Sequence, residues 1–386
     1  MKTDIHYKKF LNLAIITLLF CMYSYGQHET EQIDLSGTWQ FKIDSHDRGV
    51  SEKWYSKNLS ETIEWPGSMA ENGKGNEITV NSKWTGKIVD STWFYDEKYA
   101  KYRKPGNVKI PYWLQPEKHY IGAAWYQKEV EIPSVWDGKH IELTLERPHW
   151  ETQVWVDDRH LGMQNSLGTA HIYDLTDYLK PGKNIISIRV DNRVKDVHPG
   201  ENSHSISDHT QSNWNGIVGE IKLNATAPVI IENVKLYPDV ANKKVTVIAQ
   251  VKNFSGKAQK CQLVIKAVGL GENKQAHEQV VREIEVDSNG QFEIDYPMGK
   301  SPLLWDEFNP NLYAMELSLK SPSGIYKEQV TFGMREFKAE GKRFAVNGRP
   351  VFLRGTLECA IFPLTGYPPT DVDEWKRILK IVQNHG

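Results

Sequence analysis

The chain has 386 residues, of which 39% are hydrophobic and 25% are charged, a balance typical of globular proteins and not of disordered ones. A chain of this length is expected to hold about two or three domains. Its formal net charge of −2 argues against a protein that binds nucleic acid or an anionic membrane through electrostatics. Aromatic residues are abundant, with 13 Trp, 17 Tyr and 12 Phe; any single ring is by default a core residue, and some rings can stack on sugars.

The N-terminus has the pattern of a secretory signal peptide. Three lysines within the first nine residues precede the apolar run FLNLAIITLLFCM, and a segment of small residues ends at Gly26. The run of 13 residues is shorter than the span of about 20 that crosses a membrane. Cys21 lacks the small preceding residues that lipid attachment prefers. We therefore expect residues 1–26 to be removed, the protein to be secreted or periplasmic, and no later segment to enter a membrane.

Cysteine usage points to a fold that is stabilised by its hydrophobic cores. Cys21 falls in the expected signal peptide, which leaves Cys261 and Cys359 in the mature chain. Two distant cysteines make neither a disulfide framework nor a metal-type spacing. We expect no metal and no cofactor.

The segment from Ile33 to Thr226 consists of short runs of alternating apolar residues separated by turns. AAWYQKEVEIP, HIELTLER, TQVWVDDRHLG and NIISIRVDN all show this period of two. Asp158-Arg159-His160 and Pro181-Gly182 predict tight turns. The pattern predicts a two-sheet β-sandwich of the jelly-roll kind over residues 27–227.

A second β-rich block covers residues 228–334. Its strand-like runs include KKVTVIAQVKNFS, KCQLVIKAVG, GQFEIDYP and LYAMELSLKS, and Ser288-Asn289-Gly290 has turn chemistry. The spacing fits about seven strands, and the block has no Cys…Trp…Cys pattern. We predict an immunoglobulin-like sandwich without its disulfide.

The last segment, residues 335–386, changes character. RFAVNGRPVFLRGT predicts a hairpin that turns at Asn347-Gly348 and continues into an apolar strand over 351–353. TDVDEWKRILKIVQNHG predicts a helix capped by Thr370 and stopped by Gly386. The expected apolar face of this helix comprises Val372, Trp375, Ile378, Leu379 and Val382.

A strand followed by a loop and a helix forms one βα unit, and one such unit cannot bury both faces of its strand. We therefore expect the 386 residues to end inside a domain.

The order of these segments resembles glycoside hydrolase family 2, which includes β-galactosidases, β-glucuronidases and β-mannosidases. The strings LSGTWQFKID, WYQKEVEIP, NWNGIVGEIKL and FGMREFKAEGKRFAVNGRPVFLRGT are similar to successive parts of that family and span the mature chain. The resemblance implies a sugar-binding jelly roll, an immunoglobulin-like sandwich and the start of a (β/α)8 catalytic barrel, here truncated after its first βα unit.

The resemblance also implies a retaining hydrolase of terminal β-O-glycosidic bonds, with two glutamates about 5–5.5 Å apart on later barrel strands. Neither glutamate falls within these residues, so we assign no catalytic residue and expect the chain as written to be inactive. After Arg354-Gly355 the sequence LECAIF replaces the His-rich run of the galactosidase branch, so no particular sugar is assigned.

The polar loop 195–216 is the main candidate for substrate contact, because long loops inside compact domains are often functional and the matching family loop reaches the barrel pocket. Its candidate residues are Asp208, His209, Gln211, Asn213 and Trp214. The structural alternative is that Trp214 anchors the sandwich while Asp208 and His209 cap a turn. The histidines of this loop match no common spacing of metal ligands.

Two further candidates follow the expected barrel strand. Arg354 supports the pocket in the family, and a structural salt bridge is the equally weighted alternative. Glu358 stands at the carboxyl end of the strand, where barrels do their chemistry, so it is interpreted as a substrate or supporting contact or as a loop-structural residue. The aromatic segment 84–113 either packs across the sandwich, the simpler interpretation, or stacks on an extended glycan.

Two functions therefore stay open. The first is the N-terminal part of a secreted family 2 glycosidase that acts on an oligo- or polysaccharide and binds no nucleic acid. The second is a non-catalytic, secreted carbohydrate-binding β-sandwich protein. The partial barrel favours the first, because a binding module gains nothing from an unpaired strand and an exposed amphipathic helix. The oligomeric state is left open by the sequence.

Overall fold

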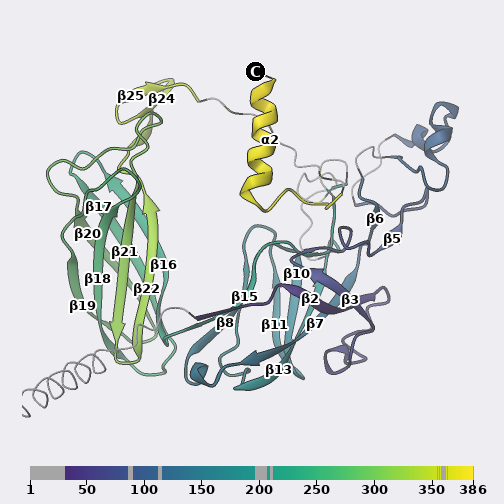
Figure 1. The fold of residues 1–386 in the computed structure, drawn as a ribbon, viewed down its shortest axis with the longest axis horizontal. Helices are drawn as coiled ribbons and strands as arrows, with labels where there is room; N and C mark the ends of the chain where they lie inside the picture. Colours follow the sequence, from purple (N-terminus) through teal and green to yellow (C-terminus); the bar gives the residue numbers. More distant parts are fainter. Residues whose placement is uncertain are drawn as a thin grey trace, which may run out of the picture. The chain divides into compact units, whose positions relative to one another are not determined.

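The computed structural model describes residues 31–85, 90–111, 115–195, 207–208, 212–353, 355, 357, 362 and 364–385. These residues form two compact units, both built mainly of β-strands (Figure 1). The first comprises Gln32–Ala225 with the described residues after 353, and the second comprises Thr226–Leu353. The predicted fold class, a jelly-roll sandwich followed by an immunoglobulin-like sandwich, is confirmed. None of the helices in the described part of the chain has the length and apolar character that a membrane span requires.

The first unit contains a six-stranded and a four-stranded sheet. The six-stranded sheet has the order β11-β10-β13-β7-β2-β3, with β2 Gly37–Asp44, β3 Glu61–Trp65, β7 Ala123–Ile132, β10 Glu151–Val156, β11 Arg159–Asn165 and β13 Gly182–Asp191. The four-stranded sheet has the order β1-β15-β8-β12, with β1 Glu31–Asp34, β8 His140–Leu145, β12 His171–Asp174 and β15 Ile221–Thr226.

Several short elements complete the first unit. A small sheet of order β4-β14-β9 joins β4 Gly67–Ser68, β9 Pro148–His149 and β14 Gly216–Ile217, and a ribbon pairs β5 Asn76–Glu77 with β6 Lys118–His119. The 3-10 helices are η1 Trp54–Ser56, η2 Ser91–Phe94, η3 Glu97–Tyr102 and η4 Ser134–Trp136.

The hairpin that joins β10 to β11 corrects one turn prediction. The turn residues are Asp157 and Asp158, and Arg159 already pairs with Val156 across the hairpin. Asp157 adopts φ 52°, a conformation that short polar residues tolerate. Four adjacent polar residues, 157–160, allow the turn to be placed one residue too late from the sequence alone.

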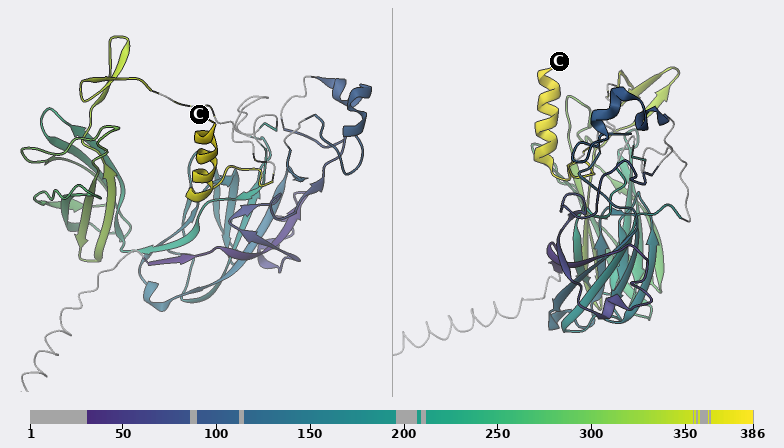
Figure 2. Two further views of the ribbon diagram at one scale, coloured as in Figure 1. Left: turned by 45° about the horizontal axis from the view of Figure 1, so that its top comes forward. Right: turned by 90° about the vertical axis from the view of Figure 1, so that its right-hand side faces the viewer.

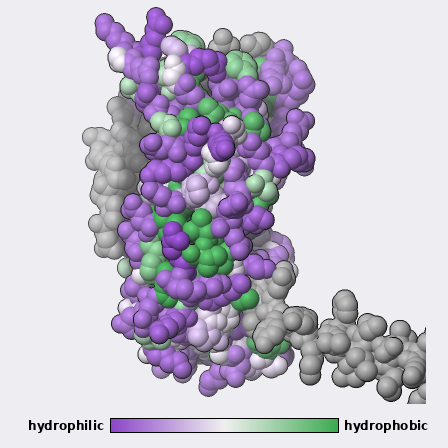
Figure 3. Space-filling view, turned by 90° about the vertical axis from the view of Figure 1, so that its left-hand side faces the viewer, coloured by the Kyte–Doolittle hydropathy of each residue, from purple (hydrophilic) through white to green (hydrophobic). Residues whose placement is uncertain are grey.

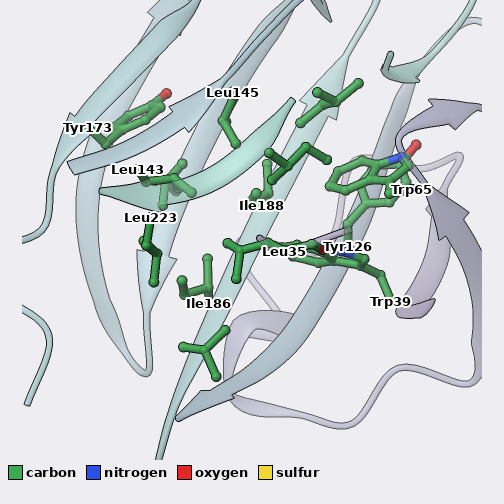
Figure 4. Packing of buried hydrophobic residues seen from close by; sticks show 14 of the residues in the cluster. Leu35, Trp39, Trp65, Tyr126, Leu143, Leu145, Tyr173, Ile186, Ile188 and Leu223 are labelled. Atoms are coloured by element: carbon green, nitrogen blue, oxygen red, sulfur yellow. Dashed lines mark hydrogen bonds between the residues drawn. The ribbon is translucent and has the colours of Figure 1, made fainter. Parts of the chain in front are cut away.

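The core of the first unit lies between its two large sheets. Leu143 and Leu223 of the four-stranded sheet point toward Ile186 and Ile188 of the six-stranded sheet (Figure 4), and none is exposed. Trp65 lies in the same cluster and is 2% exposed. Its ring stacks on that of Tyr126 with centroids 3.9 Å apart. Burial of each such side chain stabilises the fold by about 1.5–3 kcal/mol.

The second unit packs a three-stranded sheet and a four-stranded sheet around its own core. Their orders are β16-β17-β20 and β19-β18-β21-β22, with β16 Val229–Asp239, β17 Lys244–Asn253, β18 Gln259–Gly269, β19 Val280–Val286, β20 Asn289–Pro297, β21 Tyr313–Ser321 and β22 Gly324–Phe332. This total agrees with the predicted strand number. Cys261 lies in the core as a free thiol.

Two details of the second unit refine the sequence prediction. The bend before β20 lies at Asp287 and Ser288, and Asn289 already begins the strand. Residues along β17 and β18 alternate between buried and partly exposed positions. Most residues on the face drawn in Figure 3 are hydrophilic, and the largest group of apolar residues lies near its centre, with smaller groups above and below it.

The hairpin predicted near the C-terminus is confirmed, but its apolar strand is shorter than expected. β24 Arg343–Val346 and β25 Arg349–Val351 join β23 Phe337–Glu340, and the turn residues Asn347 and Gly348 have φ 51° and 74°. Phe352 lies outside β25 and is 86% exposed. A parallel barrel strand is buried only between neighbouring strands and covering helices, whereas among the described residues β25 pairs only with β24, in an antiparallel hairpin.

The C-terminal helix α2 Val372–Asn384 is also confirmed, with a different cap. The side chain of Asp371, not Thr370, accepts a hydrogen bond from the Glu374 amide at 2.7 Å. An N-cap carboxylate of this kind satisfies an amide that the helix leaves unpaired. The expected stop at Gly386 lies outside the described residues. On the predicted apolar face, Val372, Leu379 and Val382 are exposed.

Candidate functional site

Three of the seven predicted contact residues are described, and they gather at one end of the jelly-roll sandwich. Asp208 and Asn213 are buried, and Trp214, two residues before β14 of the small sheet, is half-buried. The other predicted residues, His209, Gln211, Arg354 and Glu358, lie outside the described residues.

Asn192 joins the end of β13 to the candidate loop. Its side-chain oxygen accepts a hydrogen bond from the Gly122 amide at 2.8 Å. Its side-chain nitrogen donates to the carbonyls of Tyr120, at 2.8 Å, and Trp214, at 3.1 Å. Asn192 is fully buried, and a buried amide is stable only when its polar atoms are paired in this way.

Asn215, which directly follows Trp214, holds the loop in the same manner. Its side-chain nitrogen donates to the carbonyls of Gly122 and Val190, and its oxygen accepts from the Tyr126 hydroxyl at 2.7 Å. Burial raises the pKa of Tyr126 well above its ordinary value, so the hydroxyl remains protonated and donates. The candidate loop is thereby fixed to the aromatic core.

Asp208 connects the loop to a separate segment at Thr85. One carboxylate oxygen accepts from the Thr85 amide at 2.5 Å, and the other accepts from the Asn213 amide at 3.3 Å. The side-chain nitrogen of Asn213 donates to the Thr85 hydroxyl at 2.8 Å and to the Asn192 carbonyl at 3.1 Å. Through these contacts Asp208 and Asn213 hold the backbone of the loop against Thr85 and Asn192.

His119 of β6 faces Asp208, a contact that the sequence did not suggest. Its Nε2 atom lies 3.6 Å from a carboxylate oxygen of Asp208, and the Asp208 side chain is only 2% exposed. The imidazole packs beside the ring of Trp84, with centroids 4.6 Å apart. Two backbone amides already donate to the buried Asp208 carboxylate, and His119, whose Nε2 forms no hydrogen bond with a described residue, adds a cation beside it when the imidazole is protonated.

Trp214 is held between two other rings. Its indole stacks on His149 with centroids 4.4 Å apart, and Tyr367 lies on it at 5.6 Å and a tilt of 51°. His149 Nδ1 also donates to the Trp214 carbonyl at 2.7 Å. These contacts make Trp214 an anchor of the sandwich; a sugar contact by the same ring stays a prediction.

Residues 364–370, here called the docking loop, pack against the jelly roll at Trp214. The Tyr367 hydroxyl donates to a carboxylate oxygen of Glu71 at 2.7 Å, and the Ser68 hydroxyl donates to the Thr365 carbonyl at 2.5 Å. Gly366 has φ 85°, and a Cβ there would lie 3.3 Å from Trp214. Burial, together with the Glu71 carboxylate, raises the pKa of Tyr367, which keeps the donor protonated.

A buried ion network lies at the end of β13, immediately before the candidate loop. Arg189 donates to Asp47 at 2.6 Å and to Asp191 at 3.0 Å, and Arg193 donates to Asp191. Burial alone raises the pKa of Asp191, but the hydrogen bonds from Arg193 and the charge of Arg189 outweigh it and hold the pKa well below its usual range.

The described residues of the site are aromatic rings, amides and single carboxylates, and most of them contact one another. Asp208 and Glu71 are each engaged by hydrogen bonds from other segments. Within the described residues, no group of three or more His, Cys, Asp or Glu side chains is placed to hold a metal ion.

Comparison with known proteins decides the family. Residues 33–227 match the model "Glycosyl hydrolases family 2, sugar binding domain", and residues 229–335 match the model "Glycosyl hydrolases family 2". The chain belongs to glycosyl hydrolase family 2.

Individual family 2 relatives carry two kinds of name. A protein named beta-galactosidase from Thermoanaerobacter pseudethanolicus is 26% identical over 67% of this chain and 35% of its own length. A protein named beta-glucuronidase from Paenibacillus borealis is 23% identical over 83% of this chain and 48% of its own length. The chain thus spans between about a third and a half of these two relatives.

A solved family 2 structure supports the fold. The crystal structure of a beta-glucuronidase from Bacteroides uniformis matches with a TM-score of 0.68 and 16% identity, over 92% of this chain and 38% of the solved chain. The predicted resemblance to family 2 is therefore confirmed, together with its sugar-binding and immunoglobulin-like domains.

Proposed function

We propose that these residues are the N-terminal portion of a secreted family 2 glycoside hydrolase that cleaves terminal β-O-glycosidic bonds with retention. The consecutive match of residues 33–335 to two family 2 models is the observation that carries the proposal. The relatives' names and the share of their length that this chain spans support it further. The proposal includes export by residues 1–26 and a catalytic (β/α)8 barrel that begins near residue 335.

In this proposal the chemistry belongs to two glutamates on barrel strands beyond residue 386. One protonates the leaving oxygen, the other forms a covalent glycosyl-enzyme, and the first then activates water. A sugar held in a single orientation reacts faster, because its translational and rotational entropy is lost on binding and not in the chemical step. The jelly-roll end built around Asp208, Asn213 and Trp214 would supply that orientation, together with His209, Gln211, Arg354 and Glu358.

The docking loop supports a role of the jelly roll in orienting the sugar. It follows the expected first barrel strand, and it contacts Ser68, Glu71 and Trp214 of the jelly roll. In the proposed enzyme this contact would set the jelly-roll residues beside the carboxyl ends of the barrel strands, where barrel enzymes place their active sites.

A turnover assay tests the proposal. The complete reading frame and the 386-residue chain are purified and incubated with aryl β-galactoside, β-glucuronide and β-mannoside. We expect the complete product to hydrolyse at least one of them and the 386-residue chain to hydrolyse none. Turnover by the shorter chain would contradict the placement of the catalytic pair.

The alternative is a non-catalytic carbohydrate-binding protein, favoured by the recognition groups at the described site. It requires a stop codon after residue 386 and sugar binding without turnover. A reading frame that continues without further βα repeats would remove the hydrolase proposal.

A further inference from the structure

An aromatic segment outside the candidate site has the features of a second carbohydrate surface. Five rings fall within twelve residues of η2 and η3, namely Trp93, Phe94, Tyr95, Tyr99 and Tyr102, here called the aromatic platform. None is buried, and Tyr95 is 66% exposed. The sandwich core nearby encloses Trp65 and Tyr126 almost completely, so the platform does not serve as a core.

The platform is held in shape by its own hydrogen bonds. Asp90 caps η2 by accepting from the Thr92 amide at 2.9 Å, and Asp96 caps η3 by accepting from the Lys98 amide at 3.0 Å. The Arg103 guanidinium joins the two turns by donating to the carbonyls of Trp93, at 3.2 Å, and Asp96, at 2.8 Å. A surface that is already ordered loses little conformational entropy when a ligand binds.

The platform is anchored to the same unit as the candidate site. Val108 and Ile110, which follow the platform, are buried. The chain then enters β6, where His119 faces Asp208. In Figures 1 and 2 the blue segment that carries the platform extends beyond β5 and β6. The platform is therefore connected to the candidate site through one short ribbon and stands apart from it.

The charge of this segment is opposite to that of the whole chain. Residues 90–109 contain five basic and three acidic side chains, whereas the chain carries a formal charge of −2. Two of the acids are the capping residues Asp90 and Asp96. Lys98 pairs with Asp96 at 3.2 Å, but Lys101 and Lys104 form no ion pair within the described residues. The Lys101 ammonium lies 4.7 Å from the Tyr102 ring centroid.

We infer that the aromatic platform is a second binding site, which takes an extended acidic glycan. Tyr95, the most exposed of its rings, stacks on the C–H face of a sugar unit, and Lys101 and Lys104 pair with carboxylate or sulfate groups along the same chain. This site holds the polymer independently of hydrolysis, and it goes beyond the function proposed above, which concerns the terminal sugar.

Affinity electrophoresis of the 386-residue chain tests the inference. Native gels contain polygalacturonate, chondroitin sulfate or neutral hydroxyethylcellulose, so carboxylate and sulfate are compared with an uncharged polymer. We expect retardation in at least one acidic gel and a smaller effect in the neutral gel. Added salt should weaken the retardation, because ionic screening reduces the lysine contribution.

Matched variants assign the retardation to the platform. The test variant combines Tyr95→Ser with Lys101→Glu and Lys104→Glu. The control combines Tyr237→Ser, a tyrosine that is 53% exposed in the second unit, with Lys257→Glu and Lys260→Glu. We expect the test variant to bind about fivefold more weakly or worse, the scale of losing one principal contact, and the control to bind like wild type.

Three results would overturn the inference: no retardation of wild type, equal retardation in neutral and acidic gels, or equal losses in the test and control variants. Circular dichroism of each variant shows whether it is folded. Because the assay measures binding by the 386-residue chain and not turnover, its failure leaves the hydrolase proposal intact, and failure of the turnover assay leaves this inference intact.

Discussion

At the scale of single residues, Asp208 organises the candidate site from a buried position. Its two oxygens accept backbone amides from Thr85 and Asn213, and its open side faces His119. Such a carboxylate fixes loop geometry because each lost partner would leave a buried polar group unsatisfied. These contacts assign Asp208 a role in loop ordering, and its role in sugar recognition stays a prediction.

The pair of Asp208 and His119 gives the first prediction. His119→Phe removes the only side-chain cation candidate that the described residues place beside the Asp208 carboxylate, so we expect a loss of about 1–3 kcal/mol in the free energy of unfolding. His119→Gln keeps a donor and should recover some of that loss. Thermal unfolding followed by tryptophan fluorescence measures both, with exposed His160→Phe as the control. Equal effects of Phe and Gln would show that His119 acts through packing alone.

Asp191 gives a prediction about acid stability. Its pKa is depressed in the folded state, so the unfolded chain takes up a proton at a higher pH than the folded chain. The stability it contributes is present above the unfolded pKa of about 3.9 and is lost as the pH falls below it. We expect Asp191→Asn to be less stable than wild type at pH 7 and to lose less stability on acidification. Urea unfolding at several pH values measures the free energy of unfolding of both proteins. The same change of this free energy with pH in wild type and Asp191→Asn would contradict the prediction.

At the scale of elements, the docking loop couples the C-terminal segment to the jelly roll. Its hydrogen bonds join residues 297 and 296 positions apart in sequence, through Ser68 and Glu71. Tyr367 is 8% exposed and Glu71 is exposed, so their hydrogen bond lies at the edge of this contact. This contact explains why the residues after 353 group with the jelly roll and not with the unit that precedes them in the chain.

A double-mutant cycle tests this coupling. Glu71→Gln and Tyr367→Phe should each lower the protection of residues 364–370 against hydrogen exchange. Their effects should be non-additive, with a coupling energy of about 0.5–3 kcal/mol, because Tyr367→Phe removes the same hydrogen bond that Glu71→Gln weakens by taking the charge from the acceptor. Tyr237→Phe in the second unit is the matched control. Additive effects would show that the bond between Glu71 and Tyr367 does not hold the loop.

Elements with regular periodicity could be predicted from the sequence, and their ends could not. The alternation along β17 and β18 and the Asn347-Gly348 turn are local signals, which the structure confirms. The cap at Asp371 and the end of β25 at Val351 differ from the prediction. Adjacent capping residues compete within one turn, and a strand extends only as far as its partners do.

The residues of the candidate site also fall into two groups, those that the sequence predicts and those that it does not. The family resemblance selected Asp208, Asn213 and Trp214 from one loop. His119 and Glu71 carry no local pattern, because their importance comes from partners on distant segments. The buried asparagines were missed for the same reason, although a polar residue at the end of an apolar strand is a usable signal. That residues 209 and 211 contact sugar stays a prediction.

At the scale of the whole molecule, two separate cores support two compact units of one family 2 chain. The chain spans 35% and 48% of the two relatives described above. In the function proposed above, the described units contribute to sugar recognition, and the catalytic pair lies beyond residue 386. We thus propose that recognition and catalysis reside in different parts of one protein.

Covalent trapping tests that claim most directly. The complete reading frame is treated with activated 2-fluoro β-glycosides, which arrest a retaining glycosidase as its glycosyl-enzyme, and the labelled peptide is mapped by mass spectrometry. We predict a single label on a glutamate beyond residue 386 and no label on the 386-residue chain. A label on any residue from 31 to 385, or turnover of aryl β-glycosides with inversion, would contradict the account.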